Sequence, residues 1–151
     1  MKKLTILDLD NTLIYGTTIK RNLSAKILFH FSKYLTIYER PHAREFVKRC
    51  HTIGDVVVFT TAEREYATKI CEHLEINPVE LFTREDCLFL NGSYVKSVPE
   101  YYFDAYDSIT IIDDIPEIWD KKSHQKCRII GVKAFTGEVV DDELRKLEIR
   151  V

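Results

Sequence analysis

Short runs of apolar, often β-branched residues are the feature of this sequence that most constrains its fold. Three such runs are Leu4–Leu9, Asp55–Thr60 and Ile109–Asp113, each with a polar or acidic residue at or just after its end, and Lys126–Lys133 is a fourth candidate. Continuous Val, Ile and Leu runs are typical of parallel strands that are covered on both faces. The sequence therefore predicts a parallel sheet with a layer of structure on each side.

Helical patterns lie between these runs. One begins at Pro41, which suits the first position of a helix, and ends at Gly54, a suitable C-cap. The others are Glu63–Leu74 and Asp141–Leu147. Strands that alternate with helices imply βαβ units with right-handed crossovers, so we expect an α/β fold with a Rossmann-like parallel sheet flanked by helices.

Two segments depart from this alternation. Strand-forming residues on both sides of Asn91-Gly92 predict a β-hairpin over residues 87–96, inserted between the second and third strand–helix units. Residues 22–38 are ambiguous, because Ser24–Tyr34 can be drawn as a capped helix or as an irregular strand and the periodicity does not decide. We expect a helix there.

Length and charge limit the class of protein. A chain of 151 residues, 45% of them hydrophobic, can bury roughly 70% of its unfolded surface in one core without help from disulfides or a structural metal. Its 22 Lys and Arg residues against 24 Asp and Glu residues give a net charge of −2. Duplex nucleic acid and anionic membranes attract a basic excess, which is lacking here. We expect a single domain over residues 1–151 that binds neither.

The cysteines and the N-terminus favour a reducing compartment. The four cysteines form no C-x-x-C pair and have no histidine at zinc-ligand spacing, so we expect buried, reduced thiols. The apolar segment Leu4–Leu7 is far too short for a signal peptide or a membrane span. A cytoplasmic location is therefore expected, and the oligomeric state stays open.

Polar side chains follow three of the predicted strands and the hairpin, at the edge where open α/β sheets bind their ligands. They are Asp8 and Asp10 at the end of the first strand, Thr60 at the end of the second, Asp113 and Asp114 at the end of the third, and Lys96 after the hairpin. Four carboxylates at one edge repel one another, so a hard divalent cation must join them if the cluster forms.

The charges of this set suit a phosphate. One Mg²⁺ together with Lys96 would leave the four carboxylates with a single net negative charge, and Mg²⁺ prefers one or two carboxylates plus substrate phosphate oxygens. The Thr60 hydroxyl and the unpaired N–H groups at the start of the next helix are available donors.

Each signal has an ordinary structural explanation when it is taken alone. An Asp-x-Asp pair is common in turns, Asp113-Asp114 can begin a solvated loop, and Lys96 can be a surface lysine. Thr60 can cap the following helix. The order of the signals, each at the end of a predicted strand or of the hairpin, favours one functional site.

These residues resemble the motifs of a known superfamily. The segment Asp8–Leu13 resembles the D-x-D-x-T signature of the haloacid dehalogenase-like (HAD) phosphotransferases. Thr60, Lys96 and Asp113-Asp114 are similar to the second, third and fourth motifs of that superfamily, in the same order.

Longer segments narrow the resemblance to one branch, over residues 4–147. They are Arg40–Phe46, Val58–Ala67, and Arg84–Cys87 followed by Gly92–Lys96. They are similar to the NLI-interacting-factor-like phosphatases, the small phosphatases of the polymerase C-terminal domain and their FCP-type relatives. The stretch from Arg84 to Lys96 is specific to this branch.

The resemblance implies a mechanism. Asp8 would be the nucleophile that forms an aspartyl-phosphate, and Asp10 would protonate the leaving alkoxide and then activate the hydrolytic water. Thr60 and Lys96 would hold the transferring oxygens.

The resemblance also implies Mg²⁺ as the cofactor. Its ligands would be the Asp8 carboxylate, the backbone carbonyl of Asp10 and the Asp114 carboxylate. Asp113 would lie behind them, outside the ligand set.

Two departures from the branch bear on the substrate. Only 27 residues, 14–40, separate the first motif from the Arg-Pro signature, which is fewer than in the polymerase-tail phosphatases. We therefore expect the strand hairpin of those phosphatases to be absent there or replaced by a helix. The 35 residues between Thr60 and Lys96 leave no room for a large cap domain. A capless site is open, which suits a phosphate on a macromolecule or requires an oligomer to close it.

The leading hypothesis is a Mg²⁺-dependent phosphomonoesterase whose substrate is a phosphorylated Ser or Thr segment of a protein. Arg84 and Tyr94 are its candidate substrate contacts. One alternative is a small-molecule or nucleotide phosphatase with the same site. Another is a non-catalytic, receiver-like phospho-acceptor module, which Asp10 disfavours because a general acid has no use beside a long-lived acyl phosphate.

Overall fold

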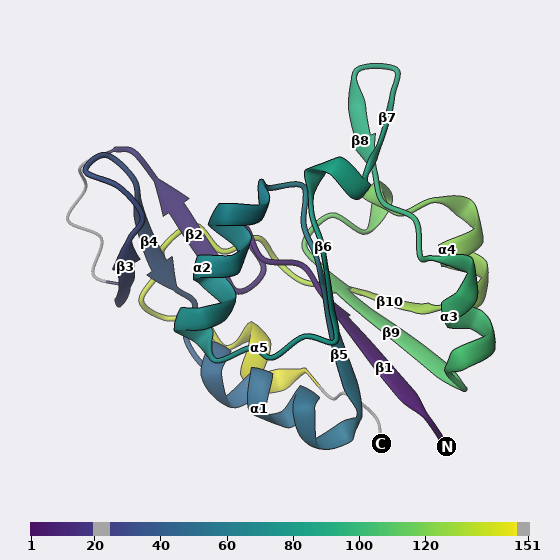
Figure 1. Ribbon diagram of the computed structural model, residues 1–151. Helices are drawn as coiled ribbons and strands as arrows, with labels where there is room; N and C mark the ends of the chain where they lie inside the picture. The colour runs from purple at the N-terminus through teal and green to yellow at the C-terminus, as the bar shows by residue number, and fades with distance from the viewer. Residues whose placement is uncertain (20–24, 148–151) are drawn as a thin grey trace.

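Five parallel strands form the central sheet of the computed structural model, which describes residues 1–19 and 25–147 (Figure 1). In sheet order they are β10 (Arg128–Gly131), β9 (Ser108–Asp113), β1 (Lys3–Leu7), β5 (Asp55–Phe59) and β6 (Glu80–Phe82). All neighbouring pairs are parallel. The four predicted runs are strands of this sheet, so the α/β fold class is confirmed. Strand β6 has no predicted counterpart, because three residues are too few to form an apolar run.

Helices cover both faces of the sheet (Figure 1). One layer consists of α1 (Ala43–Ile53), α2 (Arg64–Leu74) and α5 (Glu143–Lys146), and the other of α3 (Glu100–Ala105) and α4 (Lys121–Lys126). Alternate side chains of β5 serve the two layers, since successive residues of a strand point to opposite faces. Val56 and Val58 pack in the cluster under α1 and α2, whereas Val57 and Phe59 pack in the cluster with α3.

The predicted helix that ends at Gly54 is α1, with small differences at its ends. It begins at Ala43 rather than Pro41, because His42 at φ 69° is the N-cap. The Gly54 amide donates to the Cys50 carbonyl, as expected of a C-cap. A Cβ atom at Gly54 would lie 2.3 Å from the Lys3 carbonyl oxygen, so glycine lets this turn pass close to β1.

The helix expected within residues 22–38 is wrong for the described part of that segment, and residues 22–24 lie outside the described residues. This part of the chain instead contributes two strands, β3 (Ile27–His30) and β4 (Thr36–Glu39), to a three-stranded antiparallel sheet with β2 (Ile14–Thr17). The order of its strands is β2, β4, β3. The register shifts between Ile27 and Phe29, which breaks the alternation of a regular strand and explains the ambiguous pattern. The Phe29 ring stacks on His73 of α2, 4.1 Å between centroids.

This small sheet also corrects the expectation that the strand hairpin of the polymerase-tail phosphatases is absent or replaced by a helix. An isolated helix as short as this segment is only marginally stable in water, whereas pairing with β4 gives β3 backbone hydrogen bonds within a sheet.

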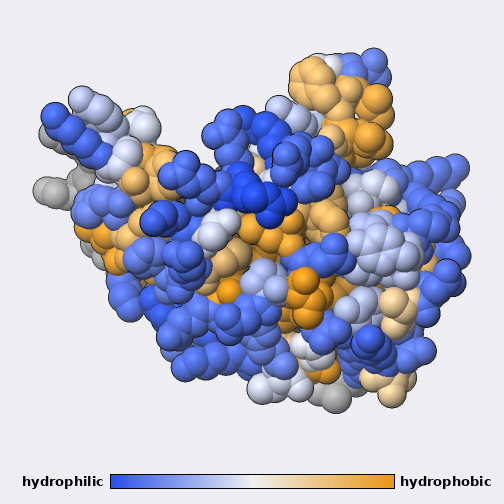
Figure 2. All heavy atoms as spheres, viewed as in Figure 1, coloured by the Kyte–Doolittle hydropathy of each residue, from blue (hydrophilic) through white to orange (hydrophobic). Residues whose placement is uncertain are grey.

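The predicted hairpin is formed by β7 (Leu88–Leu90) and β8 (Ser93–Val95). Asn91 at φ 50° and Gly92 at φ 79° make the turn, as favoured two-residue hairpin loops require. The hairpin projects from the body of the molecule (Figure 1), and its apolar side chains form the orange projection in Figure 2. Between α2 and the hairpin lie only β6 and the short 3₁₀ helix η1 (Arg84–Asp86), so residues 61–95 hold no large cap domain. Within the described ranges, no helix has the length and hydropathy needed to span a membrane.

Candidate active site

The order of the strands places a topological switch point between β1 and β9. From β1 the chain proceeds through β5 to β6 on one side, and β9 and β10 then lie on the other side of β1. Open α/β sheets bind ligands in the crevice outside the carboxyl ends of the strands at such a point. Asp8 directly follows β1 and Asp113 ends β9, so both carboxylates lie at this crevice.

Three carboxylates meet at the switch point. Asp8, Asp113 and Asp114 each present an oxygen within 4.8 Å of the others. Asp8 and Asp113 are only 7% and 2% exposed. Burial raises the pKa of all three carboxyls, since the charged forms lose contact with water. The predicted convergence of these acids is therefore observed.

Lys96 lies between two of these acids. It follows β8, and its ammonium donates to Asp8 Oδ1 at 3.0 Å, Asp113 Oδ2 at 2.9 Å and the Phe59 carbonyl at 3.0 Å. Burial alone would lower the pKa of Lys96, but the two carboxylates raise it above its ordinary value, so the side chain is charged. The surface-lysine explanation is excluded, because Lys96 is 1% exposed.

Thr12 connects the two ends of the site. Its hydroxyl donates to Asp8 Oδ2 at 2.7 Å and accepts from the Asp114 backbone N–H at 3.1 Å. Asn11, at φ 65°, forms the tight turn that brings Thr12 back over the end of β1. The threonine of the D-x-D-x-T pattern therefore fixes the relative position of the first and fourth motifs.

Asp113 and Asp114 differ in how their oxygens are used. Asp113 Oδ1 accepts from the Ile115 N–H at 2.9 Å, and Oδ2 accepts from both Lys96 and the Trp119 indole N–H, the latter at 3.0 Å. Asp114 is contacted by the Thr12 hydroxyl at a longer 3.3 Å. Asp114 thus has the more available carboxylate of the two.

Asp10 lies beside this cluster and is half-buried. Tyr66 of α2 donates a hydrogen bond of 2.7 Å to Asp10 Oδ1. Burial raises the pKa of Asp10 to about 6, and nearby Asp8 adds to the increase, whereas the Tyr66 bond opposes it. A carboxyl with this pKa can carry a proton or accept one near neutral pH.

Thr60 is buried at the end of β5 and does not cap the following helix. The N-cap of α2 is Glu63, and the Thr60 hydroxyl instead accepts from the Ala62 N–H at 3.1 Å. It therefore shapes the loop between β5 and α2, and its own proton is available to a ligand.

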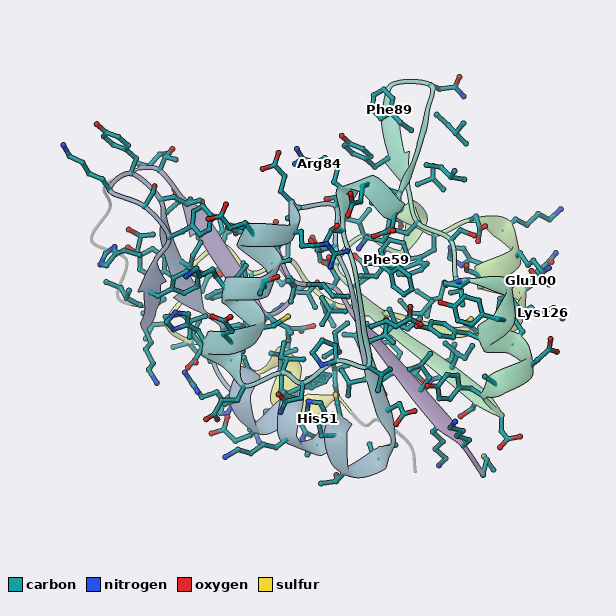
Figure 3. The ribbon with its side chains drawn as sticks, viewed as in Figure 1. His51, Phe59, Arg84, Phe89, Glu100 and Lys126 are labelled. Atoms are coloured by element: carbon teal, nitrogen blue, oxygen red, sulfur yellow. The ribbon has the colours of Figure 1, made fainter. Side chains whose placement is uncertain are left out.

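The two candidate substrate contacts lie near one another at the base of the hairpin. The Arg84 guanidinium is 5.7 Å from the centroid of the Tyr94 ring, and Arg84 Nε donates to the Thr61 carbonyl at 2.9 Å. Figure 3 shows Arg84 on the side of the molecule from which the hairpin with Phe89 projects. Both side chains thus connect the hairpin to the edge that carries Thr60.

Three residues make contacts in or beside the site that are absent from the sequence prediction. Tyr66 binds Asp10, and Trp119 binds Asp113 besides packing at the strand end, where the sequence suggests packing alone. Arg40, 0% exposed, donates to the Thr12 carbonyl at 3.0 Å and the Lys133 carbonyl at 2.7 Å. The Arg-Pro pair is the signal for Arg40, but nothing in the sequence connects the two aromatic residues to the acids.

The donor set suits a hard divalent cation. The three clustered carboxylates offer oxygen ligands only, which Mg²⁺ and Ca²⁺ prefer. Lys96 offsets one of their charges, so two net negative charges stay in a buried crevice. A divalent cation would neutralise them.

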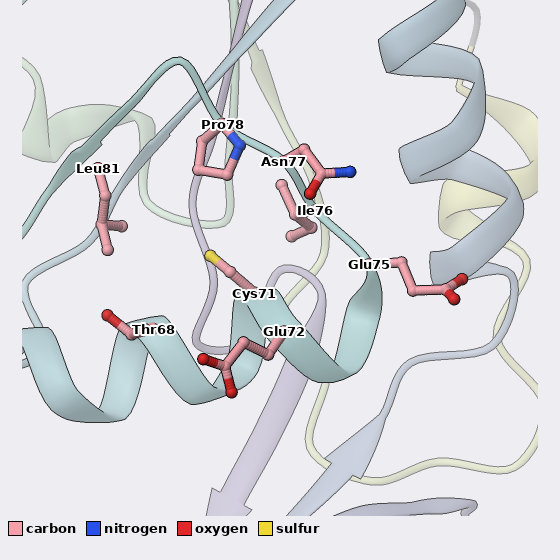
Figure 4. Close-up of a pocket in the computed structure, with 8 residues that line it drawn as sticks. All are labelled: Thr68, Cys71, Glu72, Glu75, Ile76, Asn77, Pro78 and Leu81. Atoms are coloured by element: carbon pink, nitrogen blue, oxygen red, sulfur yellow. The ribbon is translucent and has the colours of Figure 1, made fainter.

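A separate cavity of about 550 Å³ lies between the end of α2 and β6 (Figure 4). Its lining consists of Thr68, Cys71, Glu72, Glu75, Ile76, Asn77, Pro78 and Leu81. None of the predicted site residues is among them. Burial raises the pKa of the Cys71 thiol to about 12, so the cavity holds no activated nucleophile. The reactive groups are therefore those at the switch point.

The fold and the ordered acids define a phosphotransferase of the HAD type. The solved structure of Fcp1, an RNA polymerase II CTD phosphatase, has a TM-score of 0.62 and covers 89% of this chain and 42% of that one at 19% identity. The structure of a variant of fission yeast Fcp1 bound to beryllium fluoride has a TM-score of 0.61 at 17% identity and covers the same shares of the two chains. Likeness at these identities concerns the fold.

Sequence comparison identifies the family. The chain belongs to the NLI interacting factor-like phosphatases, whose family model matches residues 3–149. It is 27% identical to phosphatase Herzog of Drosophila melanogaster over 97% of this chain and 42% of that protein. It is 29% identical to the human CTD small phosphatase-like protein over 97% of this chain and 54% of that protein. The chain thus spans about half the length of these relatives, and the resemblance inferred from the motifs is confirmed.

Proposed function

We propose that this chain is a Mg²⁺-dependent phosphomonoesterase that removes phosphate from phosphorylated Ser or Thr residues of a protein. The observation that carries the proposal is the contact of the buried Lys96 ammonium with Asp8 Oδ1, at 3.0 Å, at the switch point of the sheet. A carboxylate can attack a phosphate only if its charge is offset and its position is fixed, and Lys96 does both. Membership of a phosphatase family supports the same reaction class.

Asp8 is the nucleophile in this proposal. It attacks phosphorus, and the bond from phosphorus to the leaving oxygen breaks as the aspartyl-phosphate forms. Lys96 on one oxygen and Thr12 on the other, at 2.7 Å, hold the carboxylate in one orientation. Water then attacks the same phosphorus, and the bond to Asp8 breaks, which restores the carboxylate.

Asp10 moves the protons of both steps. It donates a proton to the leaving alkoxide in the first step and takes one from the attacking water in the second. Its pKa of about 6 suits this double use, since both protonation states are accessible near neutral pH. Thr60 donates its hydroxyl proton to a transferring oxygen, and Lys96, whose three N–H groups already donate to Asp8, Asp113 and Phe59, stabilises the transferring oxygens through its charge.

The Asp8 and Asp114 carboxylates and the Asp10 carbonyl would hold Mg²⁺. When bound, this cation offsets the charge of the entering phosphate and of the carboxylates around it. Asp113 stays outside the ligand set in this proposal, because its oxygens already accept from Lys96, Trp119 and Ile115.

Two features favour a protein substrate. The solved structure of Fcp1 is that of an RNA polymerase II CTD phosphatase, an enzyme that acts on a protein, and the human relative is named a CTD small phosphatase-like protein. The site edge lies between two projecting β-elements, the β2–β4 sheet and the β7–β8 hairpin, and residues 1–19 and 25–147 place no cap over it (Figure 1). An extended phosphopeptide can reach such an edge, and the neighbouring Arg84 and Tyr94 side chains would contact it there.

A small phosphate ester is the second candidate substrate. A cavity of about 500 Å³ adjoins Asp10 and is lined in part by Phe31, Leu35, Tyr66 and Arg84. Ligand pockets of small molecules have about this size. The leaving group of a nucleotide or sugar phosphate would fit there.

The experiment that tests the proposal compares substrates under one set of conditions. Purified protein should release phosphate from an aryl phosphate with Mg²⁺ and lose that activity with a chelator. The values of kcat/KM for phosphopeptides, nucleotides and sugar phosphates then rank the candidates. A preference for small esters would replace the protein substrate by the second candidate, and no activity on any substrate would overturn the proposed reaction.

A further inference from the structure

The contact between Tyr66 and Asp10 joins residues from separate elements. Asp10 lies in the turn after β1, and Tyr66 lies in the first turn of α2. The Tyr66 hydroxyl donates to Asp10 Oδ1 at 2.7 Å, and the part of the chain that the structure describes supplies it with no second hydrogen-bond partner. The hydroxyl therefore serves the acid.

Gly16 of β2 makes room for this hydroxyl. A Cβ atom at Gly16 would lie 2.7 Å from the Tyr66 hydroxyl oxygen and 3.1 Å from the Ile37 Cδ1 atom. The first distance is shorter than contacts that real Cβ atoms make, so any larger residue must displace the tyrosine. The Phe31 ring also packs edge-on against the Tyr66 ring, with 5.4 Å between centroids. These contacts hold the Tyr66 ring in a position in which its hydroxyl reaches Asp10.

The direction of the hydrogen bond determines where Asp10 can carry a proton. A hydroxyl that donates to Oδ1 makes that oxygen the less basic of the two, so a proton on the carboxyl is favoured on Oδ2. The same bond limits rotation of the carboxyl group about its Cβ–Cγ bond. An acid catalyst depends on such placement, because a displacement of about 1 Å costs roughly 100-fold in rate.

We propose that Tyr66, for whose hydroxyl Gly16 leaves room, is a positioning residue that orients the Asp10 carboxyl for proton transfer to the leaving group. The inference rests on the proposed function, in which Asp10 is the general acid. In this inference Gly16 matters because its lack of a side chain leaves room for the Tyr66 hydroxyl, and not because of an unusual backbone conformation.

The test uses phosphate esters with different leaving groups. A leaving group of low pKa, such as nitrophenolate, departs with little help from an acid, whereas an alkoxide such as that of phosphoserine needs the proton. Tyr66→Phe should therefore lower kcat/KM, which reports the step in which the leaving group departs, by about 10- to 100-fold for phenyl and alkyl phosphates, with a much smaller effect on nitrophenyl phosphate.

Gly16→Ala gives an independent test of the same contact. It should reproduce the leaving-group dependence of Tyr66→Phe, because the new methyl group displaces the hydroxyl. In the Tyr66→Phe background it should have less additional effect, since the atom with the closest contact is gone. A full additive loss in the double variant would contradict the spatial argument.

Tyr106 offers a matched control. Its hydroxyl also donates to an aspartate at 2.7 Å, Asp55 Oδ2, and both residues are half-buried like Tyr66 and Asp10. Asp55 begins β5, at the opposite end of the strand from the site. Tyr106→Phe should leave the leaving-group dependence of the wild type unchanged. Thermal unfolding of each variant verifies that it is folded.

The possible outcomes separate this inference from the proposed function. If Asp10→Asn shows steep leaving-group dependence and Tyr66→Phe does not, the inference is overturned and the proposed function stands. An equal loss of kcat/KM on all esters would make Tyr66 a packing or substrate-contact residue. If even Asp10→Asn shows no dependence on the leaving group, the general-acid role fails, and the inference fails with it.

Discussion

Replacement of Lys96 by methionine tests the electrostatics of the site without any substrate. Methionine has a similar length, so the change removes the charge and three hydrogen bonds while it keeps most of the volume. The Asp8 and Asp113 carboxylates then stay buried together without their cation. Removal of one partner of a buried ion pair costs about 3–5 kcal/mol. At this chain length each kcal/mol lowers Tm by about 2–4 °C, so Tm should fall by about 6–20 °C.

The loss should depend on pH in a definite direction. Burial already raises the pKa values of Asp8 and Asp113 above 3.8, and the loss of Lys96 raises them further. A carboxyl whose pKa is higher in the folded state destabilises the fold once the pH exceeds the unfolded-state value, and the cost grows until the pH passes the folded-state value. The difference between the variant and the wild type should therefore be small near pH 4 and largest at neutral pH.

The assay is denaturant unfolding at pH 4 and pH 7 without divalent cations, with Lys122→Met as the control. Lys122 also pairs with a carboxylate, Glu100, but its side chain is 46% exposed. Exposed pairs contribute up to about 1 kcal/mol, so this variant should change little at either pH. If Lys96→Met loses no more stability than Lys122→Met at neutral pH, or if its loss does not depend on pH, the electrostatic reasoning is refuted.

The remaining predictions concern the individual acids. Asp8→Asn should abolish phosphate release while thermal unfolding shows an intact fold, and wild-type rates would exclude Asp8 as the nucleophile. Asp10→Asn should lower turnover by roughly 10²- to 10⁴-fold. The folded-state pKa of Asp10 is about 6, so ionisation of Asp10 destabilises the wild type as the pH rises from about 4 to 6. Denaturant unfolding without metal should therefore find Asp10→Asn about 1–3 kcal/mol more stable than the wild type at pH 7.5. Asp114→Ala should raise the Mg²⁺ concentration for half-maximal activity more than Asp113→Ala does, and the reverse order would exchange their roles.

The central strands could be predicted from the sequence because both of their faces are buried. Burial on both faces requires apolar residues at successive positions, as in Val56, Val57 and Val58, and few other structures produce such runs. The β3 strand could not be predicted. Its bulge removes the alternation of a strand, and its stability comes from pairing with β4 and from the Phe29–His73 contact, which are properties of the folded chain.

The same distinction applies to the site. Asp8, Thr60 and Asp113 could be placed together because each lies at or directly after the end of a parallel strand, and such ends meet at one edge by geometry alone. Tyr66 and Trp119 could not, because each reaches its acid from a neighbouring element whose orientation only packing determines. An aromatic residue in a helix or loop is usually a core residue, and nothing local distinguishes these two.

The near-neutral net charge of −2 conceals a strong local charge, and this has a consequence for the affinity of the site. Asp8, Asp113 and Asp114 against Lys96 leave two net negative charges in a buried crevice, which repels phosphate. A divalent cation removes that charge, so phosphate should bind well only after the cation does. By thermodynamic linkage the reverse also holds, and phosphate must tighten the binding of Mg²⁺ by the same factor. Titration of inorganic phosphate with and without Mg²⁺ measures this factor, and equal affinities would show that the acids do not control access to the site.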